Sequence, residues 1–259
     1  MRSEPILQVK NVRKAFGGVQ ALVDVSFSVC EGEVFGVIGP NGSGKTTLIN
    51  CITGFIKMDS GMVLYRGKDV TRKPPHKIAN LGITRTFQIM RPYYSLPAYK
   101  NLIVPLFSPR ARRTGGWRGG GKLGDRDTVG IDILEEIGFE RDSFVPYKLA
   151  SSLPTGYLKR LELARCLALR PEIIICDEVF SGLSMSEIAS MVPLIEKLQM
   201  EGLTLIMIEH RLRELFRVAQ RLMVLNFGEK IAEGVPEEVM EDENVKQAYL
   251  GSEKSVEYA

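Results

Sequence analysis

Nine consecutive residues have the types and spacing of a loop that holds phosphate groups. The stretch GPNGSGKTT fits the pattern G-x-x-x-x-G-K-[ST] in full and lies between an apolar run and a helical one. Its glycines let successive backbone N–H groups curl around phosphate oxygens, and the N-terminus of the following helix adds positive charge. We therefore predict a nucleotide phosphate site formed by Gly39, Pro40, Asn41, Gly42, Ser43, Gly44, Lys45, Thr46 and Thr47.

Two side chains of this loop have distinct chemical tasks. Lys45 supplies a point charge to the β- and γ-phosphates, and Thr46 offers its hydroxyl to Mg²⁺. A chance match to the pattern is expected in about 1% of chains at ordinary residue frequencies. The strand before the loop and the helix after it make a chance match rarer still, so the motif predicts nucleotide binding.

A second set of polar residues follows two later apolar runs. In EIIICDE, Asp177 and Glu178 come directly after the run, and in LTLIMIEH, His210 ends a similar one. Asp177 can hold Mg²⁺ through water, while Glu178 can polarise an attacking water as a general base. The alternatives are a solvated Asp-Glu loop for the first pair and a hydrogen-bonded core histidine for His210. His76, in RKPPHK, is predicted to lie at the surface.

These residues need a sheet that brings the ends of distant strands together. The apolar runs PEIIICDE, LTLIMIEH and RLMVLNF alternate with helical stretches such as YLKRLELARCLALR. Buried strands that alternate with helices predict a mainly parallel α/β sheet. Within residues 5–36, the runs ILQVKNV and LVDVSFSV are also typical of strands, and the second alternates apolar with polar side chains. They predict an antiparallel flank beside the parallel sheet.

Between roughly residues 89 and 152 the pattern changes and no strong strand is predicted. Helical stretches are expected near 98–107 and 128–138. Between them, residues 108–126 hold six glycines and six lysines or arginines, which predicts a mobile, solvated loop. A basic patch that contacts lipid headgroups or RNA is the alternative.

Composition narrows the class of protein. The chain has 259 residues, of which 44% are hydrophobic, and is long enough for a sizeable core. No apolar run reaches the roughly 18 residues of a membrane span, and the N-terminus lacks the apolar centre of a signal peptide. The four cysteines form no C-x-x-C pair, so we expect reduced core thiols rather than a zinc site. A net charge of +3 is too small to indicate nucleic acid, and no such partner is expected.

The order of the motifs resembles that of ABC transporter ATP-binding subunits. The resemblance is carried by KAFGGVQALVDVSF, GPNGSGKTTLINCITGF, ITRTFQIMRP, RLELARCLALRPEIIICDE, IEHRL and VKQAYLG, which extend over nearly the whole chain. Within that family, the chain is similar to the ATPases of branched-chain, or hydrophobic, amino-acid importers. The resemblance implies an α/β fold with a RecA-like P-loop NTPase core, an antiparallel β flank and an inserted helical subdomain. A single domain, 1–259, would divide into a core of residues 1–88 and 155–259 and a helical subdomain of residues 89–154.

The resemblance also implies roles for individual residues. Phe16 matches the aromatic residue that stacks on adenine, and His210 matches the histidine that contacts the γ-phosphate. Gln88 matches the glutamine that contacts Mg²⁺ or the attacking water and senses the membrane partner. The implied cofactors are ATP and Mg²⁺. The implied catalytic residues are Lys45, Gln88, Glu178 and His210, and the implied metal ligands are Thr46, Gln88 and Asp177.

The chain departs from the family at residues 153–157, where the signature Leu-Ser-Gly-Gly-Gln, which caps the γ-phosphate on the opposite subunit, is expected. Leu153 and Gly156 match, and three positions do not: Pro154, Thr155 and Tyr157. Proline offers neither a hydroxyl nor an N–H group to phosphate. We interpret the chain as having an equipped ATP site of its own and an altered trans-acting half. The alternative is that the changes are neutral and Gly156 suffices.

Two further positions also depart from the family pattern. Val179 follows Asp177-Glu178 where proline is usual, and Ser184 stands where Asp or Asn is usual, at a position that communicates across the dimer. Importers of this family commonly pair two different ATPase subunits, which would permit one altered half.

The resemblance implies an ATP-hydrolysing importer subunit that pairs with an identical or related ATPase subunit and docks on integral membrane permease subunits. Such a subunit would be cytoplasmic and peripheral on the inner face of the cell membrane. ATP binding would close the dimer and hydrolysis would reopen it, which would drive alternating access in the permease. Tyr93 and Tyr94 are candidates for the docking contact, and packing within the helical subdomain is the alternative.

Two other functions remain alternatives at this point. One is a non-transport ABC protein, although the chain has neither a second cassette nor a long coiled-coil insertion. The other is a regulatory nucleotide-binding subunit with little turnover, which Pro154 favours and Glu178 disfavours. The transported substrate, the choice between homodimer and heterodimer, and the role of residues 108–126 are not determined by these patterns.

Overall fold

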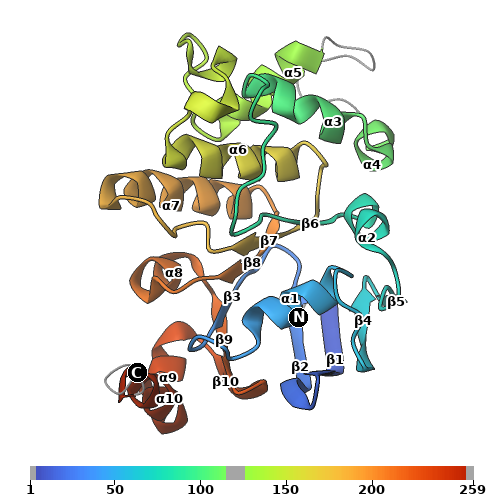
Figure 1. The fold of residues 1–259 in the computed structure, drawn as a ribbon, viewed down its shortest axis with the longest axis vertical. Coiled ribbons are helices and arrows are strands. Elements are labelled where there is room, and N and C mark those ends of the chain that lie inside the picture. Colours follow the sequence, from blue (N-terminus) through green and yellow to red (C-terminus); the bar gives the residue numbers. More distant parts are fainter. Residues whose placement is uncertain (1–3, 115–125, 255–259) are drawn as a thin grey trace.

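The computed structural model describes residues 4–114 and 126–254. Within these residues the larger sheet has six strands in the order β10-β9-β3-β8-β7-β6, of which all but β10 run parallel to their neighbours (Figure 1). The predicted parallel α/β core is confirmed. The strands are β3 (Val34–Ile38), β6 (Ile83–Arg85), β7 (Ile173–Asp177), β8 (Thr204–Ile208), β9 (Arg221–Asn226) and β10 (Glu229–Gly234).

The central strands of this sheet are buried on both faces. Every residue of β3, β7 and β8 is buried, which explains their continuous apolar runs in the sequence. Alternate residues of β7 enter two different cores, with Ile173 and Ile175 on one side and Ile174 and Cys176 on the other. The second core also holds residues of the helices α6 (Thr155–Leu167) and α7 (Met185–Met200).

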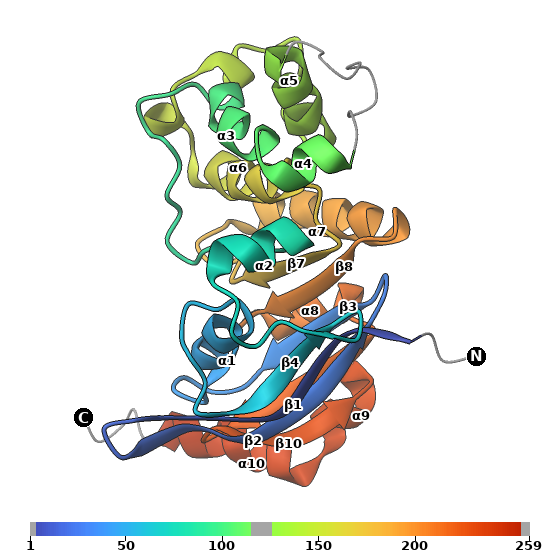
Figure 2. The same ribbon diagram turned by 90° about the vertical axis from the view of Figure 1, so that its right-hand side faces the viewer.

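An antiparallel sheet flanks the first, as expected. Its order is β2-β1-β4-β5, with β1 (Pro5–Phe16) and β2 (Val19–Cys30) forming a long hairpin (Figure 2). Helix α1 (Lys45–Ile52) shares a core with residues of both sheets, and Phe27 of β2 stacks on Phe35 of β3 with ring centroids 5.3 Å apart. This packing fixes the start of α1 against the hairpin.

The region between β6 and α6 is built from helices and lies at one end of the molecule (Figures 1 and 2). The helical stretches predicted near 98–107 and 128–138 are confirmed. The region contains a 3₁₀ turn at Tyr99–Leu102, α3 (Ile103–Leu106), α4 (Pro109–Arg113), α5 (Arg126–Glu136) and 3₁₀ turns at Val145–Tyr147 and Ala150–Ser152.

Helix α4 departs from the predicted loop at 108–126. Ser108 caps its N-terminus by accepting the N–H of Ala111 at 3.1 Å, and Pro109 suits the first helical position. The remainder of the predicted loop, residues 115–125, lies outside the described residues.

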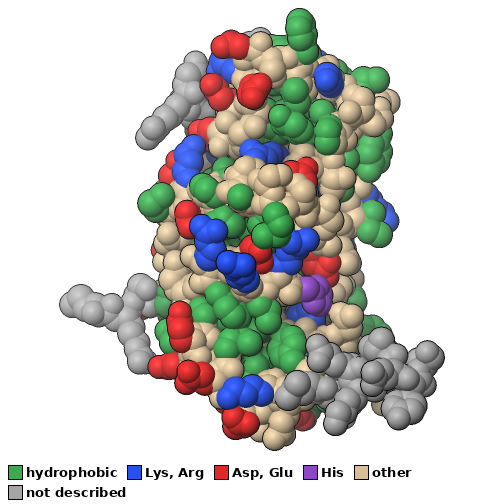
Figure 3. Space-filling model, turned by 90° about the vertical axis from the view of Figure 1, so that its left-hand side faces the viewer, with side chains coloured by type: hydrophobic (Ala, Val, Ile, Leu, Met, Phe, Trp, Pro, Cys, Tyr) green, Lys and Arg blue, Asp and Glu red, His purple; other side chains and the backbone are tan. Residues whose placement is uncertain are grey.

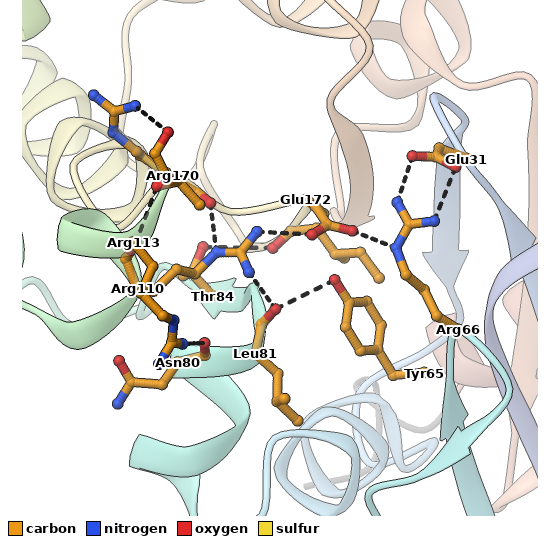
Figure 4. A network of polar contacts seen from close by, with 12 residues as sticks. Glu31, Tyr65, Arg66, Asn80, Leu81, Thr84, Arg110, Arg113, Arg170 and Glu172 are labelled. Carbon is orange, nitrogen blue, oxygen red and sulfur yellow. Dashed lines mark hydrogen bonds and ion pairs between the residues drawn. The ribbon is translucent and has the colours of Figure 1, made fainter. Parts of the chain in front are cut away.

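A buried arginine of α4 joins this helical region to the core. The guanidinium of Arg110 donates to the backbone oxygen of Arg170 at 2.6 Å, to that of Leu81 and to the Glu172 carboxylate at 2.8 Å (Figure 4). Gly82, at φ 125°, leaves room for the guanidinium, because a Cβ there would lie 2.6 Å from its central carbon. Arg110 is 9% exposed, so it does not belong to a solvated basic patch.

The remaining elements lie around this framework. None of the helices in residues 4–114 and 126–254 has the length and apolar character needed to cross a bilayer.

Figure 3 shows one face of the molecule, on which hydrophobic side chains gather below a zone of mixed basic and acidic side chains. His76 is exposed, as predicted, and the four cysteines are free thiols. The other elements are α2 (Pro75–Leu81), β4 (Ser60–Tyr65), β5 (Lys68–Asp69), α8 (Leu212–Val218), α9 (Pro236–Glu241) and α10 (Glu243–Lys254).

Candidate active site

The phosphate-binding motif forms the loop between β3 and α1, as its sequence context requires. Gly39, Gly42 and Gly44 have φ angles of 147°, 77° and 105°, a region that residues with a Cβ rarely adopt. A Cβ on Gly44 would lie 2.5 Å from the backbone oxygen of Ala21 in β2. The glycines therefore give the loop its curvature and let it lie directly against the hairpin.

Lys45 is held inside the loop. Its ammonium donates to the backbone oxygens of Gly39 at 2.7 Å and Pro40 at 2.9 Å, and the residue is 6% exposed. Burial lowers the pKa of this ammonium, whereas the negative charges of Glu178 and Asp177 oppose that effect. Lys45 is therefore a cation positioned between the loop and two carboxylates, where phosphate oxygens can replace the carbonyls as its partners.

Two predicted residues from distant parts of the sequence, Gln88 and His210, meet at the carboxylate of Glu178. Its carboxylate accepts a hydrogen bond from the Gln88 amide at 2.9 Å, and its other oxygen lies 3.2 Å from Nε2 of His210. The register explains the convergence, because Asp177 at the end of β7 lies opposite Ile208 at the end of β8. The His210 side chain is 46% exposed, so the alternative of a core histidine does not hold.

The three predicted metal ligands line one cavity. Thr46, Gln88 and Asp177 contribute to its wall, and its volume is about 860 Å³. A hydroxyl, an amide and a carboxylate are oxygen ligands of the kind Mg²⁺ prefers, and Mg²⁺ is usually bound by one or two carboxylates together with substrate phosphates. No cluster of three or more His, Cys, Asp or Glu side chains with metal-binding geometry occurs in the described parts of the chain. The donor set therefore fits an Mg²⁺ ion that is completed by phosphates and water.

Asp177 has an additional partner that the sequence motifs did not indicate. Arg85, the last residue of β6, lies 2.5 Å from its carboxylate and donates at 2.5 Å to the side-chain oxygen of Asn50 in α1. The hydroxyl of Thr86 accepts the backbone N–H of Asp177 at 3.0 Å. The residues before Gln88, in ITRTFQ, could have suggested this link only if β6 had been recognised as a strand beside β7.

The altered signature begins α6. Leu153 is buried, and Pro154 occupies the N-cap position without a side-chain hydrogen bond. Gly156 packs against the carboxylate of Glu187 in α7, and its backbone N–H is hydrogen-bonded to that carboxylate. Tyr157 packs on Phe139 with ring centroids 4.9 Å apart. The residue that replaces the usual glutamine therefore serves the packing of the helical region.

The two further departures from the family pattern also have structural partners. Val179 is 2% exposed and belongs to the core beneath α6. Ser184 caps α7 in a reciprocal capping box with Glu187. Both residues therefore stabilise the loop that follows Glu178.

Phe16 lies at the end of β1, in the hairpin that contacts the phosphate-binding loop through Ala21. Its ring is 47% exposed, with the Lys14 ammonium 5.1 Å from the ring centroid. An exposed aromatic face of this kind can stack on a base. Its role toward adenine stays a prediction.

Tyr93 and Tyr94 follow β6 on the way to the helical region. They are 43% and 47% exposed. Tyr93 lines the cavity that also contains Gln88, and the Tyr94 hydroxyl donates to the backbone oxygen of Met90 at 3.1 Å. Both rings are therefore available at the surface rather than enclosed within the helical region.

Two buried ionisable residues near Glu178 were also not predicted. Lys159 of α6 donates to the backbone oxygen of Glu178 at 2.8 Å. Glu209 accepts the N–H of Phe180 at 2.9 Å and is 2% exposed. Burial raises the pKa of Glu209 to about 8. The sequence IEH contained a signal for Glu209, because this glutamate stands directly before His210 at the end of an apolar run.

Sequence families match two parts of the chain. Residues 22–181 match the family described as ABC transporter, and residues 229–255 match the family described as branched-chain amino acid ATP-binding cassette transporter. The high-affinity branched-chain amino acid transport ATP-binding protein BraF of Pseudomonas aeruginosa is 35% identical, over 96% of this chain and 99% of its own. The probable branched-chain amino acid transport ATP-binding protein LivG of Archaeoglobus fulgidus is also 35% identical, over 96% and 97%.

Solved structures show the same fold. The ADP conformation of an ATP-binding cassette of an ABC transporter superposes with a TM-score of 0.82 at 34% identity, covering 96% of this chain and all of that one. A dimeric cassette in a post-hydrolysis state, bound to ADP and Pi, has a TM-score of 0.75 at 25% identity, covering 89% and 98% of the two chains.

Proposed function

Since the chain belongs to the family of ABC transporter ATP-binding cassettes, we propose that it is the ATP-hydrolysing subunit of an importer for branched-chain amino acids. The observation that carries the hydrolytic role is the convergence of Gln88, Glu178 and His210 beside the phosphate-binding loop. The substrate class is supported by the names of the relatives and by the family match at residues 229–255.

Each residue of the site has a task in this proposal. Lys45 exchanges its two loop carbonyls for oxygens of the β- and γ-phosphates. Glu178 accepts the proton of the attacking water, and Gln88 orients that water through its amide. His210, whose half-exposed side chain lies beside the Glu178 carboxylate, donates to the γ-phosphate. Phe16 supports the adenine ring by stacking.

The metal site is part of the same proposal. Thr46, Gln88 and Asp177 would hold Mg²⁺ in the cavity that they line. When bound there, Mg²⁺ neutralises charge on the phosphate oxygens. Because Arg85 already binds one carboxylate oxygen of Asp177, we propose that Asp177 acts on the ion through a water.

A second ATPase subunit would complete the site. Cassettes of this family form dimers, and we propose that the N-terminus of α6 faces the γ-phosphate held by the partner. Pro154 offers no N–H group there, and the Gly156 N–H is already hydrogen-bonded to the Glu187 carboxylate, so the Thr155 hydroxyl is the side-chain donor that we propose for the phosphate. The N-terminal end of a 13-residue helix adds a favourable field for an anion.

The permease would dock at the groove between the core and the helical region. The groove is part of the same cavity whose wall contains the proposed Mg²⁺ ligands. Exposed apolar side chains also line it, including Phe87, Ile89, Tyr93, Val104 and Phe107. Their exposed fractions run from 40% for Phe87 to 70% for Ile89. Exposed aromatic and apolar clusters of this kind are typical of protein interfaces.

Gln88 lies in the wall of the same groove, so a docked permease would contact the residue that also donates a hydrogen bond to Glu178. The subunit would then sit on the cytoplasmic face of the membrane.

The dependence of turnover on protein concentration tests this function. The experiment follows Mg²⁺-dependent ATP hydrolysis by the purified chain, with Glu178→Gln as the control. A rate that rises more steeply than linearly, and vanishes in the control, is the expected result for a site shared by two subunits. A strictly linear rate would contradict the shared site. Tight ATP binding without turnover at any concentration would favour the regulatory alternative or a partner with an intact signature.

A further inference from the structure

Lys159 is a buried lysine of α6 that contacts the backbone beside the site. It is 5% exposed, and its ammonium donates to the backbone oxygen of Glu178 at 2.8 Å. Burial lowers the pKa of this ammonium, and the largest opposing effect comes from the negative charge that Glu209 carries when it is ionised. A buried cation is unfavourable unless it is paired or hydrogen-bonded. The hydrogen bond to the Glu178 oxygen therefore helps to hold this cation in the interior.

The backbone of Glu178 has an unusual conformation at this contact. Its φ angle is 52°, in the left-handed region that a residue with a Cβ rarely adopts. The N–H of Glu178 donates to Ile208 of β8 at 2.9 Å, while its carbonyl accepts Lys159 and, at 3.2 Å, the N–H of Ser181. Such a conformation persists only where the surrounding contacts hold it.

The segment after Glu178 is held from the other side. The buried carboxylate of Glu209 accepts the N–H of Phe180 at 2.9 Å. Glu209 follows β8 and precedes His210, so one strand end supplies both the anchor of the loop and a partner of the Glu178 carboxylate. Lys159 is the contact that comes from α6 instead of from the sheet.

We propose that Lys159 is a positioning residue that fixes the backbone of Glu178 and so directs its carboxylate between Gln88 and His210. The inference rests on the proposed role of Glu178 as general base. Lys159 is three positions after Gly156, so the two residues lie about one turn apart on the same face of α6. The N-terminus of α6 is proposed to face the partner's ATP, and Glu178 is proposed to act on this chain's own ATP. Lys159 therefore links the two sites through its hydrogen bond to Glu178.

The test compares kcat and KM for Mg²⁺-dependent ATP hydrolysis in three variants. Lys159→Met removes the ammonium, Lys159→Arg keeps a cationic donor, and Arg160→Met is the matched control. Arg160 is the neighbouring half-buried cation of α6, but it donates to the backbone oxygen of Ile137 in the helical region at 2.7 Å. We expect Lys159→Met to lower kcat by about 10- to 100-fold, as small misplacements of a catalytic group do. KM and ATP affinity should stay unchanged.

The other variants make the result specific. Lys159→Arg should recover most of the lost kcat, and Arg160→Met should keep the wild-type kcat. In a Glu178→Gln background, Lys159→Met should cause no further loss, because the group it positions is gone. If circular dichroism shows that Lys159→Met is misfolded, Lys159→Leu, which also lacks a hydrogen-bond donor, replaces it with the same expected loss of kcat.

Two outcomes separate this inference from the proposed function. A wild-type kcat in Lys159→Met or its substitute, together with a strong loss in Glu178→Gln, would overturn the positioning role alone. A wild-type kcat in Glu178→Gln would overturn the assignment of the base, on which the inference depends. An equal loss of kcat in Arg160→Met would also overturn the inference, because general damage to α6 would then explain the effect.

Discussion

The guanidinium of Arg85 lies 2.5 Å from the carboxylate of Asp177, and the two side chains are only 6% and 5% exposed. The pair joins the ends of the adjacent parallel strands β6 and β7. Through Asn50, Arg85 also reaches α1, the helix that begins at the phosphate-binding loop. The carboxylate proposed to act on Mg²⁺ is therefore oriented by the protein itself.

Loss of Arg85 should destabilise the fold. Arg85→Met leaves the Asp177 carboxylate buried without its partner, which typically costs about 3–5 kcal/mol. Urea unfolding should show that decrease in the free energy of unfolding, and the double variant Arg85→Met/Asp177→Asn should recover much of it. A decrease below about 1 kcal/mol in the single variant would contradict the buried pair.

Loss of Lys45 should weaken nucleotide binding and leave the fold intact. The lysine makes charge-assisted hydrogen bonds, which are worth about 1.5–3 kcal/mol each, so Lys45→Met should lower ATP affinity by about 10- to 100-fold. Titration calorimetry measures the affinity. Lys77→Met, at an exposed lysine of α2, is the matched control and should bind ATP like the wild type. Equal affinities in all three proteins would count against the phosphate site.

Stability should fall with rising pH because of Glu209. Burial raises the pKa of its carboxyl from 4.5 to about 8. Between these values the native state keeps a proton that the unfolded chain releases, so the free energy of unfolding decreases as pH rises through this window. The slope is at most about 1.4 kcal/mol per pH unit for one group.

The variant Glu209→Gln isolates this group. Glutamine keeps an oxygen that can accept the N–H of Phe180 but does not titrate. Urea unfolding at about pH 6 and about pH 8 should show a smaller decrease in Glu209→Gln than in the wild type. Identical pH dependence in the two proteins would show that Glu209 does not titrate in this window.

The apolar strands and the phosphate-binding loop were predictable because their signals are local. β3, β7 and β8 are continuous buried runs, and the glycines of GPNGSGKTT specify their own backbone conformation. The positions of Asp177, Glu178 and His210 followed from the rule that parallel strands end at one edge. The roles of Asp177 and Glu178 were predicted from their place after a buried strand, and that of His210 from the family resemblance. All three roles stay predictions, as does the division of the domain at residues 88/89 and 154/155.

The contacts between distant residues were not predictable in this way. β6 has only three residues, too few for a periodic signal, so the Arg85–Asp177 pair was missed. Lys159 reads as an ordinary exposed helical lysine until α6 is packed on the loop after β7. In the predicted basic loop, Arg110 could be assigned to the core only once Gly82 and the end of α2 were placed beside it.

The buried contacts of Arg110 should contribute to stability. Arg110→Met removes hydrogen bonds to the Arg170 and Leu81 oxygens and to Glu172, and we expect a loss of about 2–3 kcal/mol in the free energy of unfolding. Thermal unfolding of Arg113→Met provides the comparison, since this exposed arginine of α4 makes one bond to the Asn80 oxygen at 3.2 Å. The free energy of unfolding of Arg113→Met should lie within about 0.5 kcal/mol of the wild-type value. Equal losses in the two variants would contradict a specific role for Arg110.

The most direct measurement is single-turnover hydrolysis of prebound ATP, started by Mg²⁺, in the wild type and in Glu178→Gln. The geometry predicts that both proteins bind ATP with similar affinity and that only the wild type releases phosphate at a measurable rate. Phosphate release by Glu178→Gln at the wild-type rate would show that the carboxylate between Gln88 and His210 is not the base, and would contradict the account of the site.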